Sequence, residues 1–324
     1  MAELSFTVMG SPALLAVPDD DRDLLEAASA RLDELERKWS RFLPGSEVSR
    51  LNQRPGARTV VSAETALLVE LAHVAHEQTA GWFNPALLAE IVDAGYDRSH
   101  ELLAAPKSLH GLPSGGTVDP RPAPTLPDGA FMVDREAGLV RLGDGMAFDP
   151  GGIGKGLAAD LVATELIHAG AEWAQVDLGG TVRVAGPSPH GGTWPVLVDA
   201  PSGRLMPMAA ITVPCGGVAT SSRAKRRWSH YGVDQHHLID PRSGRPSVSP
   251  LLCVTVVAGE TWWAQVLAKA ALLAGPVQGR ALVEAHEAAA LLVDEDGTLS
   301  TVGGLEEWLT TFRAGDRQTP VEVS

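Results

Sequence analysis

A glycine-rich segment at residues 148–160 carries the residue types that a phosphate site needs. It reads Phe-Asp-Pro-Gly-Gly-Ile-Gly-Lys-Gly-Leu-Ala-Ala-Asp, and Lys155 stands where helical spacing begins. Glycine lacks a Cβ and lets free backbone amides approach an anion, while a helix N-terminus and a cation favour negative charge. The segment therefore predicts an anion site, although a glycine-rich turn that only packs a helix onto a sheet would read the same.

Two known phosphate loops can be compared with this segment. A Walker A loop ends in Gly-Lys followed by Ser or Thr, whereas here Gly156 follows Lys155 and Asp149 replaces the first glycine, so it is not a P-loop. Residues 154–159 loosely fit the Gly-x-Gly-x-x-Ala dinucleotide fingerprint, and Asp177 ends a strand about 20 residues further on. Because an aspartate and a proline interrupt the preceding strand, a Rossmann-type NAD-dependent oxidoreductase is only the remote alternative.

A second candidate group lies later in the chain. His237 opens the run His-Leu-Ile-Asp-Pro-Arg-Ser-Gly-Arg-Pro, and a histidine at a strand end beside such a turn can act as an acid–base group. A histidine hydrogen-bonded into the turn is the alternative. The basic run at residues 225–227 could attract an anionic ligand or form a solvated loop, and we favour the loop.

Composition limits the class of protein. The chain has 324 residues, 44% of them hydrophobic, which is enough for a substantial core. Its net charge of −14 argues against general nucleic-acid binding, since a phosphate backbone needs a basic surface. We expect no membrane span and no signal peptide. We expect Cys215 and Cys253 to be buried thiols, which indicates a cytoplasmic location.

Strands and helices alternate irregularly along the chain, with several hairpins. This order predicts an α+β fold rather than a doubly wound sheet. Residues 40–52 read as a loop. Helices are expected, among other places, at residues 155–169, 261–273 and 277–288. One domain is expected over residues 1–315, with a proline-rich loop at 104–129 and a frayed tail at 316–324.

Taken together, these motifs resemble the ApbE family, flavin transferases that move FMN from FAD onto proteins. The matching segments occur in order along nearly the whole chain: Met9-Gly10-Ser11, residues 40–52, Gly81-Trp82-Phe83-Asn84-Pro85, residues 149–160, Asp177-Leu178-Gly179-Gly180, Ala219-Thr220-Ser221 and residues 237–246. The resemblance implies an ApbE-like fold with largely antiparallel sheets, packed helices and a ligand cleft between subdomains.

The resemblance also implies a substrate and a reaction. FAD would bind with its pyrophosphate near Lys155 and with Mg²⁺ polarising it, and FMN would pass to a Ser or Thr hydroxyl of an acceptor protein as AMP leaves. His237 is the best candidate for the base, and Lys155 and Asp160 complete the implied catalytic set. The implied FAD-binding residues are Met9, Phe42, Asn84, Asp149, Gly152, Gly154, Lys155, Gly179, Gly180, Thr181, Ser221 and His237.

The chain departs from the family at the magnesium site. The family motif Ala-Asp-x-x-Ala-Thr becomes Ala-Gln-Val-Leu-Ala-Lys here, so Gln265 and Lys269 replace the two ligands, and Gly154 and Gln265 are left to bind a metal. Magnesium prefers hard anionic oxygen, and an ammonium repels it. Either Lys269 takes the place of the metal, or the chain is a non-catalytic or metal-independent FAD- or nucleotide-binding relative, or the helix merely exposes a Gln–Lys face.

Overall fold

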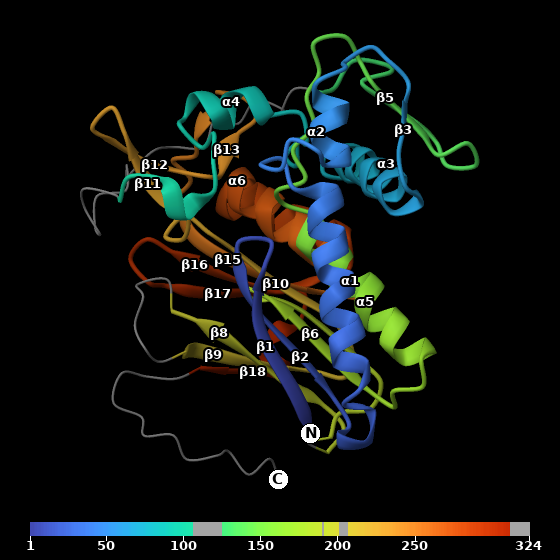
Figure 1. The fold of residues 1–324 in the computed structure, drawn as a ribbon. Helices are drawn as coiled ribbons and strands as arrows, with labels where there is room; N and C mark the ends of the chain where they lie inside the picture. Colours follow the sequence, from blue (N-terminus) through green and yellow to red (C-terminus); the bar gives the residue numbers. More distant parts are fainter. Residues whose placement is uncertain (106–124, 190, 201–206, 312–324) are drawn as a thin grey trace.

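An eight-stranded sheet forms the centre of the molecule (Figure 1). The computed structural model describes residues 1–105, 125–189, 191–200 and 207–311. The strands of the central sheet are β1 (Ala2–Val8), β2 (Ser11–Val17), β6 (Ala174–Leu178), β7 (Thr181–Ala185), β10 (Gly216–Ser222), β15 (Leu251–Ala258), β16 (Ala289–Asp294) and β17 (Leu299–Val302). They lie side by side in this order, and each pairing in the sheet is antiparallel.

The remaining elements surround this sheet. The helices are α1 (Leu24–Trp39), α2 (Glu47–Asn52), α3 (Ala63–Gln78), α4 (Leu88–Asp93), α5 (Gly154–His168) and α6 (Thr261–Ala285). The smaller sheets contain β8 (Trp194–Asp199), β9 (Pro207–Val213) and β18 (Leu309–Thr311); β3 (Thr59–Val60), β4 (Phe131–Asp134) and β5 (Leu139–Leu142); β11 (Arg227–His230) and β12 (Val233–His236); and β13 (Ile239–Asp240) and β14 (Arg245–Pro246).

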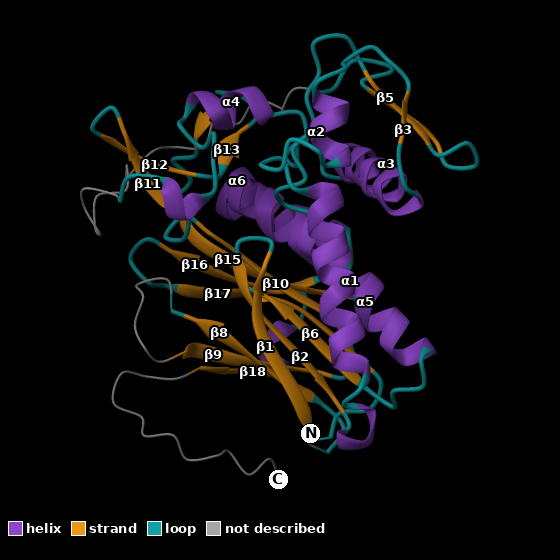
Figure 2. Ribbon diagram, viewed as in Figure 1, coloured by secondary structure: helices purple, strands orange, loops and turns teal. Residues whose placement is uncertain are grey.

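The molecule is layered, with helices on one face of the central sheet and a small sheet on the other (Figure 2). Helices α5 and α6 pack against β6, β7, β10 and β15, and α1 packs against α5. On the opposite face, buried side chains of β8 and β9 join those of β7, β10 and β16 in a second core cluster. Covering both faces removes the apolar side chains of the central strands from water.

The α+β class predicted from sequence is confirmed, and the antiparallel pairing excludes the parallel sheet of a Rossmann domain. One local expectation is wrong: the loop expected at residues 40–52 contains α2, whose N-terminus is capped by Ser46 through the amide of Ser49. The two helices expected on either side of Pro276 are confirmed as the two halves of α6, which meet at a kink where Gly275 has a non-helical φ of 81°. The expected tail at 316–324 lies outside the described residues.

The exposure of the two cysteines and the burial of one apolar helix can be compared with the expectations from sequence. Cys253 is buried in β15 as expected, but Cys215 is exposed, because it lies in the turn between β9 and β10. Within the described ranges, α6 is the one helix long and apolar enough, by length and composition alone, to span a membrane. Of its most apolar window, 61% is buried inside the protein, so its apolar character is that of a core helix.

Candidate functional site

A cavity of about 1130 Å³ opens at one end of the central sheet, where β1 turns into β2. Its walls come from that turn, residues 40–43, the glycine-rich loop before α5, the ends of β6 and β10, and the first turns of α6. Small-molecule sites usually occupy roughly 300–1,000 Å³, so this cavity has room for a ligand as large as a dinucleotide.

Most residues expected from the sequence lie together in this cavity. The lining includes Met9, Phe42, Asp149, Gly152, Gly154, Lys155, Gly179, Gly180, Thr181, Ser221, His237, Gln265 and Lys269. Met9 reaches the wall from the β1–β2 turn, where Met9 and Gly10 have φ of 52° and 61°, the left-handed conformations typical of tight hairpins. The fold thus brings together side chains more than 250 positions apart in sequence.

Two expected residues do not line the cavity. The Asn84 carboxamide oxygen accepts a hydrogen bond from the amide of Ala86, and so shapes the turn behind the wall. Asp160 accepts hydrogen bonds from the amides of Thr261 and Trp262 at 3.0 and 2.9 Å, and so caps the N-terminus of α6. We therefore assign Asp160 a positioning role instead of the catalytic one expected from sequence, because it holds α6 against α5.

The amides of the glycine-rich loop are not free, contrary to the expectation from sequence. Those of Gly152, Ile153 and Gly154 all donate to the carbonyl of Pro150, at 2.9 to 3.2 Å. The amide of Gly151 donates to the Asp149 carboxylate. An anion in this cavity must therefore be attracted chiefly by side-chain cations.

Those cations surround the start of α5. The Lys155 ammonium and the Arg226 guanidinium both donate to the Ser11 hydroxyl, at 3.4 and 3.1 Å. Burial lowers the pKa of Lys155 to about 7; Arg226 adds to this effect, and Asp177 opposes it. Burial in turn raises the pKa of Asp177, whose carboxylate accepts a hydrogen bond from the amide of Gly180. Lys155 is thus poised to gain or lose a proton according to the charge of the ligand.

Lys269 supplies a further cation from α6. Its side chain is 9% exposed, and its ammonium donates to the carbonyl of Gly151 at 3.0 Å and lies 5.5 Å from the centre of the Phe83 ring. Burial lowers the pKa of Lys269, and Asp149 opposes that shift. Gly152 makes room for it: a Cβ at this position would lie 2.8 Å from Lys269 Cδ and 3.1 Å from Nζ.

The residues at the expected metal position do not fit Mg²⁺. The Gln265 side-chain oxygen is already used, since it accepts the amide hydrogen of Gly156 at 2.8 Å. Lys269 places an ammonium where a ligand oxygen is required. Among the described residues, no group of three or more His, Cys, Asp or Glu side chains is placed to hold a metal. Magnesium requires several hard oxygen ligands, and this arrangement does not supply them.

His237 faces the same cluster of cations. Its Nδ1 is buried and has no hydrogen-bond partner among the residues that the structure describes. Burial lowers the pKa of His237 well below its ordinary value, and Arg226, Lys269 and Lys155 lower it further. The imidazole is therefore neutral at physiological pH and can accept a proton, and an anionic ligand would make it more basic by offsetting the cations.

An aromatic wall forms another side of the cavity. The Phe42 and Tyr96 ring centres are 5.7 Å apart, and Tyr96 lies 5.0 Å from Trp228. The Arg41 guanidinium lies over both the Phe42 and the Tyr96 rings and is 3.5 Å from the Asp149 carboxylate. These contacts hold Phe42 and Tyr96 in the cavity wall, where they can contact a planar ring of a ligand.

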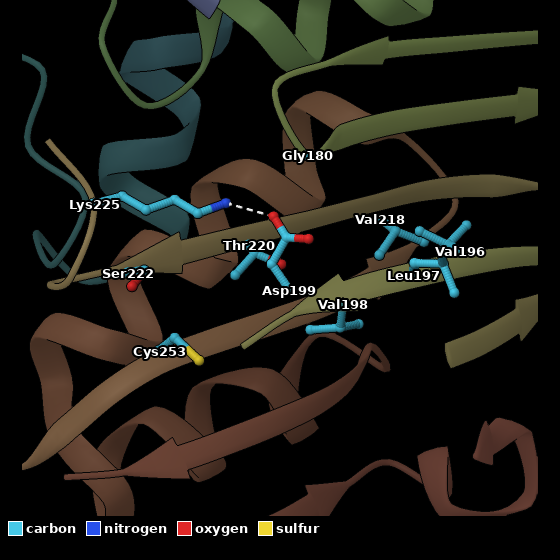
Figure 3. A pocket seen from close by; sticks show the side chains of 10 residues that line it. All are labelled: Gly180, Val196, Leu197, Val198, Asp199, Val218, Thr220, Ser222, Lys225 and Cys253. Atoms are coloured by element: carbon cyan, nitrogen blue, oxygen red, sulfur yellow. Dashed lines mark hydrogen bonds and ion pairs between the residues drawn. The ribbon is translucent and has the colours of Figure 1, made fainter. Parts of the chain in front are cut away.

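The structure adds cavity residues that sequence reasoning missed. Ser11, Arg41, Tyr96 and Arg226 line it. The solvated loop favoured for residues 225–227 is wrong for Arg226, which lines the cavity, and for Arg227, which is buried in β11 and pairs with Asp234. Lys225 also lines the large cavity, and it forms an exposed ion pair with Asp199 at 3.0 Å beside a small cavity of about 20 Å³ (Figure 3). That space is large enough for about one water molecule and not for a cofactor.

Comparison with known proteins identifies the family. A model of the ApbE family matches residues 7–292. A protein named FAD:protein FMN transferase from Klebsiella pneumoniae (strain 342) is 27% identical over 271 residues, which cover 80% of this chain and 79% of the relative. A protein of the same name from Vibrio cholerae serotype O1 is 25% identical over 311 residues, covering 90% and 84%.

Solved structures agree at the level of the fold. The crystal structure of the ApbE protein from Thermotoga maritima superposes with a TM-score of 0.78 at 24% identity, covering 94% of this chain and 98% of that one. The flavin transferase ApbE from Vibrio cholerae gives a TM-score of 0.72 at 21% identity, covering 95% and 98%. Since the family model matches most of the sequence that builds the central sheet and the cavity, the chain belongs to the ApbE family.

Proposed function

We propose that this chain is an FAD:protein FMN transferase, which moves FMN from FAD to a Ser or Thr hydroxyl of an acceptor protein. The observation that carries the proposal is the cavity of about 1130 Å³ in which Lys155, Arg226 and Lys269 surround the start of α5 and His237 faces them. Membership of a family with relatives named for this reaction supports it.

The reaction is a phosphoryl transfer. The acceptor oxygen forms a bond to the phosphorus of the FMN half, the bond between that phosphorus and the bridging oxygen breaks, and AMP leaves with the bridging oxygen. Negative charge develops on the phosphoryl oxygens and the leaving group, so positioning and charge neutralisation provide most of the catalysis. Lys155 and Arg226 would supply positive charge from the Ser11 side of the cavity. We assign no step to a metal.

The proton of the acceptor hydroxyl needs a base. His237 fits this role because its imidazole is neutral, lines the cavity and has one ring nitrogen without a partner in the described part of the chain. Binding of the FAD pyrophosphate beside the cations would raise the pKa of His237 and so strengthen it as a base. The aromatic wall of Phe42 and Tyr96 would hold one of the two ring systems of FAD.

Mass spectrometry tests the proposal. The protein is incubated with FAD and an acceptor protein of the Vibrio cholerae relative, and the acceptor should gain the mass of one FMN while AMP is released. His237→Asn should abolish the mass gain and retain FAD binding. FAD binding without any mass gain would favour the alternative, a relative that binds FAD without transferring it. A cytoplasmic location stays a prediction, which fractionation of the source cells would test.

A further inference from the structure

We propose that the Lys269 ammonium neutralises the FAD pyrophosphate in the place of a divalent metal, so that this protein binds and uses FAD without magnesium. The inference rests on the proposed function, because it takes FAD as the ligand of the cavity. It concerns residues 265–269 of α6, which face the start of α5.

The first argument is that the Lys269 side chain is built into the wall. Its ammonium is held by the Gly151 carbonyl, and its aliphatic part passes over Gly152, where any Cβ would collide with it. The Phe83 ring lies on another side of the ammonium. A lysine on an exposed Gln–Lys face would show none of these contacts and would not be 9% exposed. The interpretation as a solvated helix face is therefore wrong.

The second argument concerns what the ammonium can still bind. It carries three protons, and the described residues offer one acceptor within hydrogen-bond distance, the carbonyl of Gly151. Lys269 lines the cavity together with Lys155 and Gly154, so a phosphate oxygen at the start of α5 could accept a hydrogen bond from this ammonium. Burial disfavours the charged form of Lys269, and a bound anion would restore it.

The third argument is that neither the loop amides nor a metal held by Gln265 can replace this cation at the start of α5. The loop amides are already bonded to Pro150 and Asp149. The Gln265 oxygen, the best remaining ligand for a metal, accepts the amide hydrogen of Gly156. A divalent ion beside Gln265 would be repelled by the positive charge of Lys269. It would also have to replace the hydrogen bond between the Gly156 amide and the Gln265 oxygen, which joins α5 to α6. Gln265 and Lys269 thus have complementary roles in the site. Gln265 holds α6 against α5 through the amide of Gly156, and Lys269 supplies the positive charge.

FAD titration with and without magnesium tests the inference. Fluorescence titrations are made in EDTA and in excess Mg²⁺ for the wild type, Lys269→Met and the control Lys38→Met, whose lysine pairs with Glu34 and Glu64 away from the cavity. Wild type should bind FAD equally well in both conditions. Lys269→Met should bind FAD about tenfold or more weakly, as expected for loss of a charge-assisted contact, and riboflavin, which lacks phosphate, with unchanged affinity. Lys38→Met should match wild type.

Two further measurements separate a ligand-binding role from a structural one. Lys269→Met should raise the melting temperature of the free protein, because an apolar side chain replaces a buried charge. A purely structural lysine would lower it instead. The double variant Gln265→Asp, Lys269→Thr supplies two oxygen ligands at i and i+4 on one helix face and should bind FAD tightly only with Mg²⁺.

The outcomes distinguish the inference from the proposed function. Wild-type FAD binding that rises tenfold or more with Mg²⁺ would overturn the metal replacement and leave the transferase intact. Equal FAD affinity of Lys269→Met and Lys38→Met would do the same. Absence of FAD binding in every condition would overturn the proposed function and the inference together.

Discussion

The FAD affinity of this protein should fall as the pH rises from about 6 to about 8, because Lys155 titrates in this range. Burial and Arg226 lower its pKa to about 7 in the free protein. FAD carries a singly charged diester on each phosphate throughout this range, so the ligand's own charge stays constant. The protonated lysine attracts the pyrophosphate and the neutral lysine does not, which sets the sign: affinity is highest below the pKa and is lost above it.

The size of the effect follows from the pKa. A lysine of pKa about 7 is roughly 90% protonated at pH 6 and roughly 10% protonated at pH 8. If FAD binds only to the protonated form, its affinity falls by about tenfold, equivalent to about 1.4 kcal/mol. The protein should also take up close to one proton for each FAD bound near pH 8, because the bound phosphates raise the pKa of Lys155.

Fluorescence titration of FAD across this pH range measures the effect, and calorimetry in buffers of different ionisation enthalpy measures the proton uptake. Lys155→Arg should bind FAD with little pH dependence, since a guanidinium remains charged. Lys155→Met should bind weakly at every pH, and Lys38→Met should behave as wild type. Equal wild-type affinity at both ends of the range, or a pH dependence that survives in Lys155→Arg, would refute the assignment of this titration to Lys155.

Three further predictions concern the support of the site. Asp160→Ala should lower the free energy of unfolding in urea by about 1–2 kcal/mol, because α6 loses its cap, and should leave FAD affinity unchanged. A loss of FAD affinity in this variant would show that Asp160 acts in ligand binding. Gly156→Ala should cost about 1–3 kcal/mol in the same assay, because its Cβ would lie 2.5 Å from Trp262 Cα. Buried His236 has a folded pKa of about 4, so stability should fall by about 3 kcal/mol as the pH drops from 6.5 to 4, and His236→Gln should flatten this loss.

The sequence predicted the class of fold and most of the cavity wall, because both depend on local patterns. The apolar residues of α1 up to Trp39 recur at helical spacing and are buried, and Ser62, a typical N-cap residue, caps α3 through the amide of Thr65. Gly152, Lys155 and His237 lie in one cavity. Local spacing does not predict that they meet, and the family resemblance does.

The sequence could not separate residues that line the cavity from residues that hold its walls. Glu47 accepts hydrogen bonds from the amide and hydroxyl of Ser62, and Asn52 exchanges two hydrogen bonds with the backbone of Phe148. Both are motif residues, yet these contacts tie α2 to the start of α3 and to the start of the glycine-rich segment. Arg226 was missed for the opposite reason, since a basic run on a turn usually points into solvent.

The backbone amides of the glycine-rich loop are already hydrogen-bonded, and this explains why side-chain cations dominate the site. A loop with free amides can bind an anion whatever side chains surround it, whereas this loop donates its hydrogens to Pro150 and Asp149 and leaves anion binding chiefly to side chains. Burial lowers the pKa values of Lys155 and Lys269, and the positive charge of Arg226 lowers that of Lys155 further. An anionic ligand would offset both effects, so affinity for the pyrophosphate and the cost of keeping these lysines charged without it have the same physical origin.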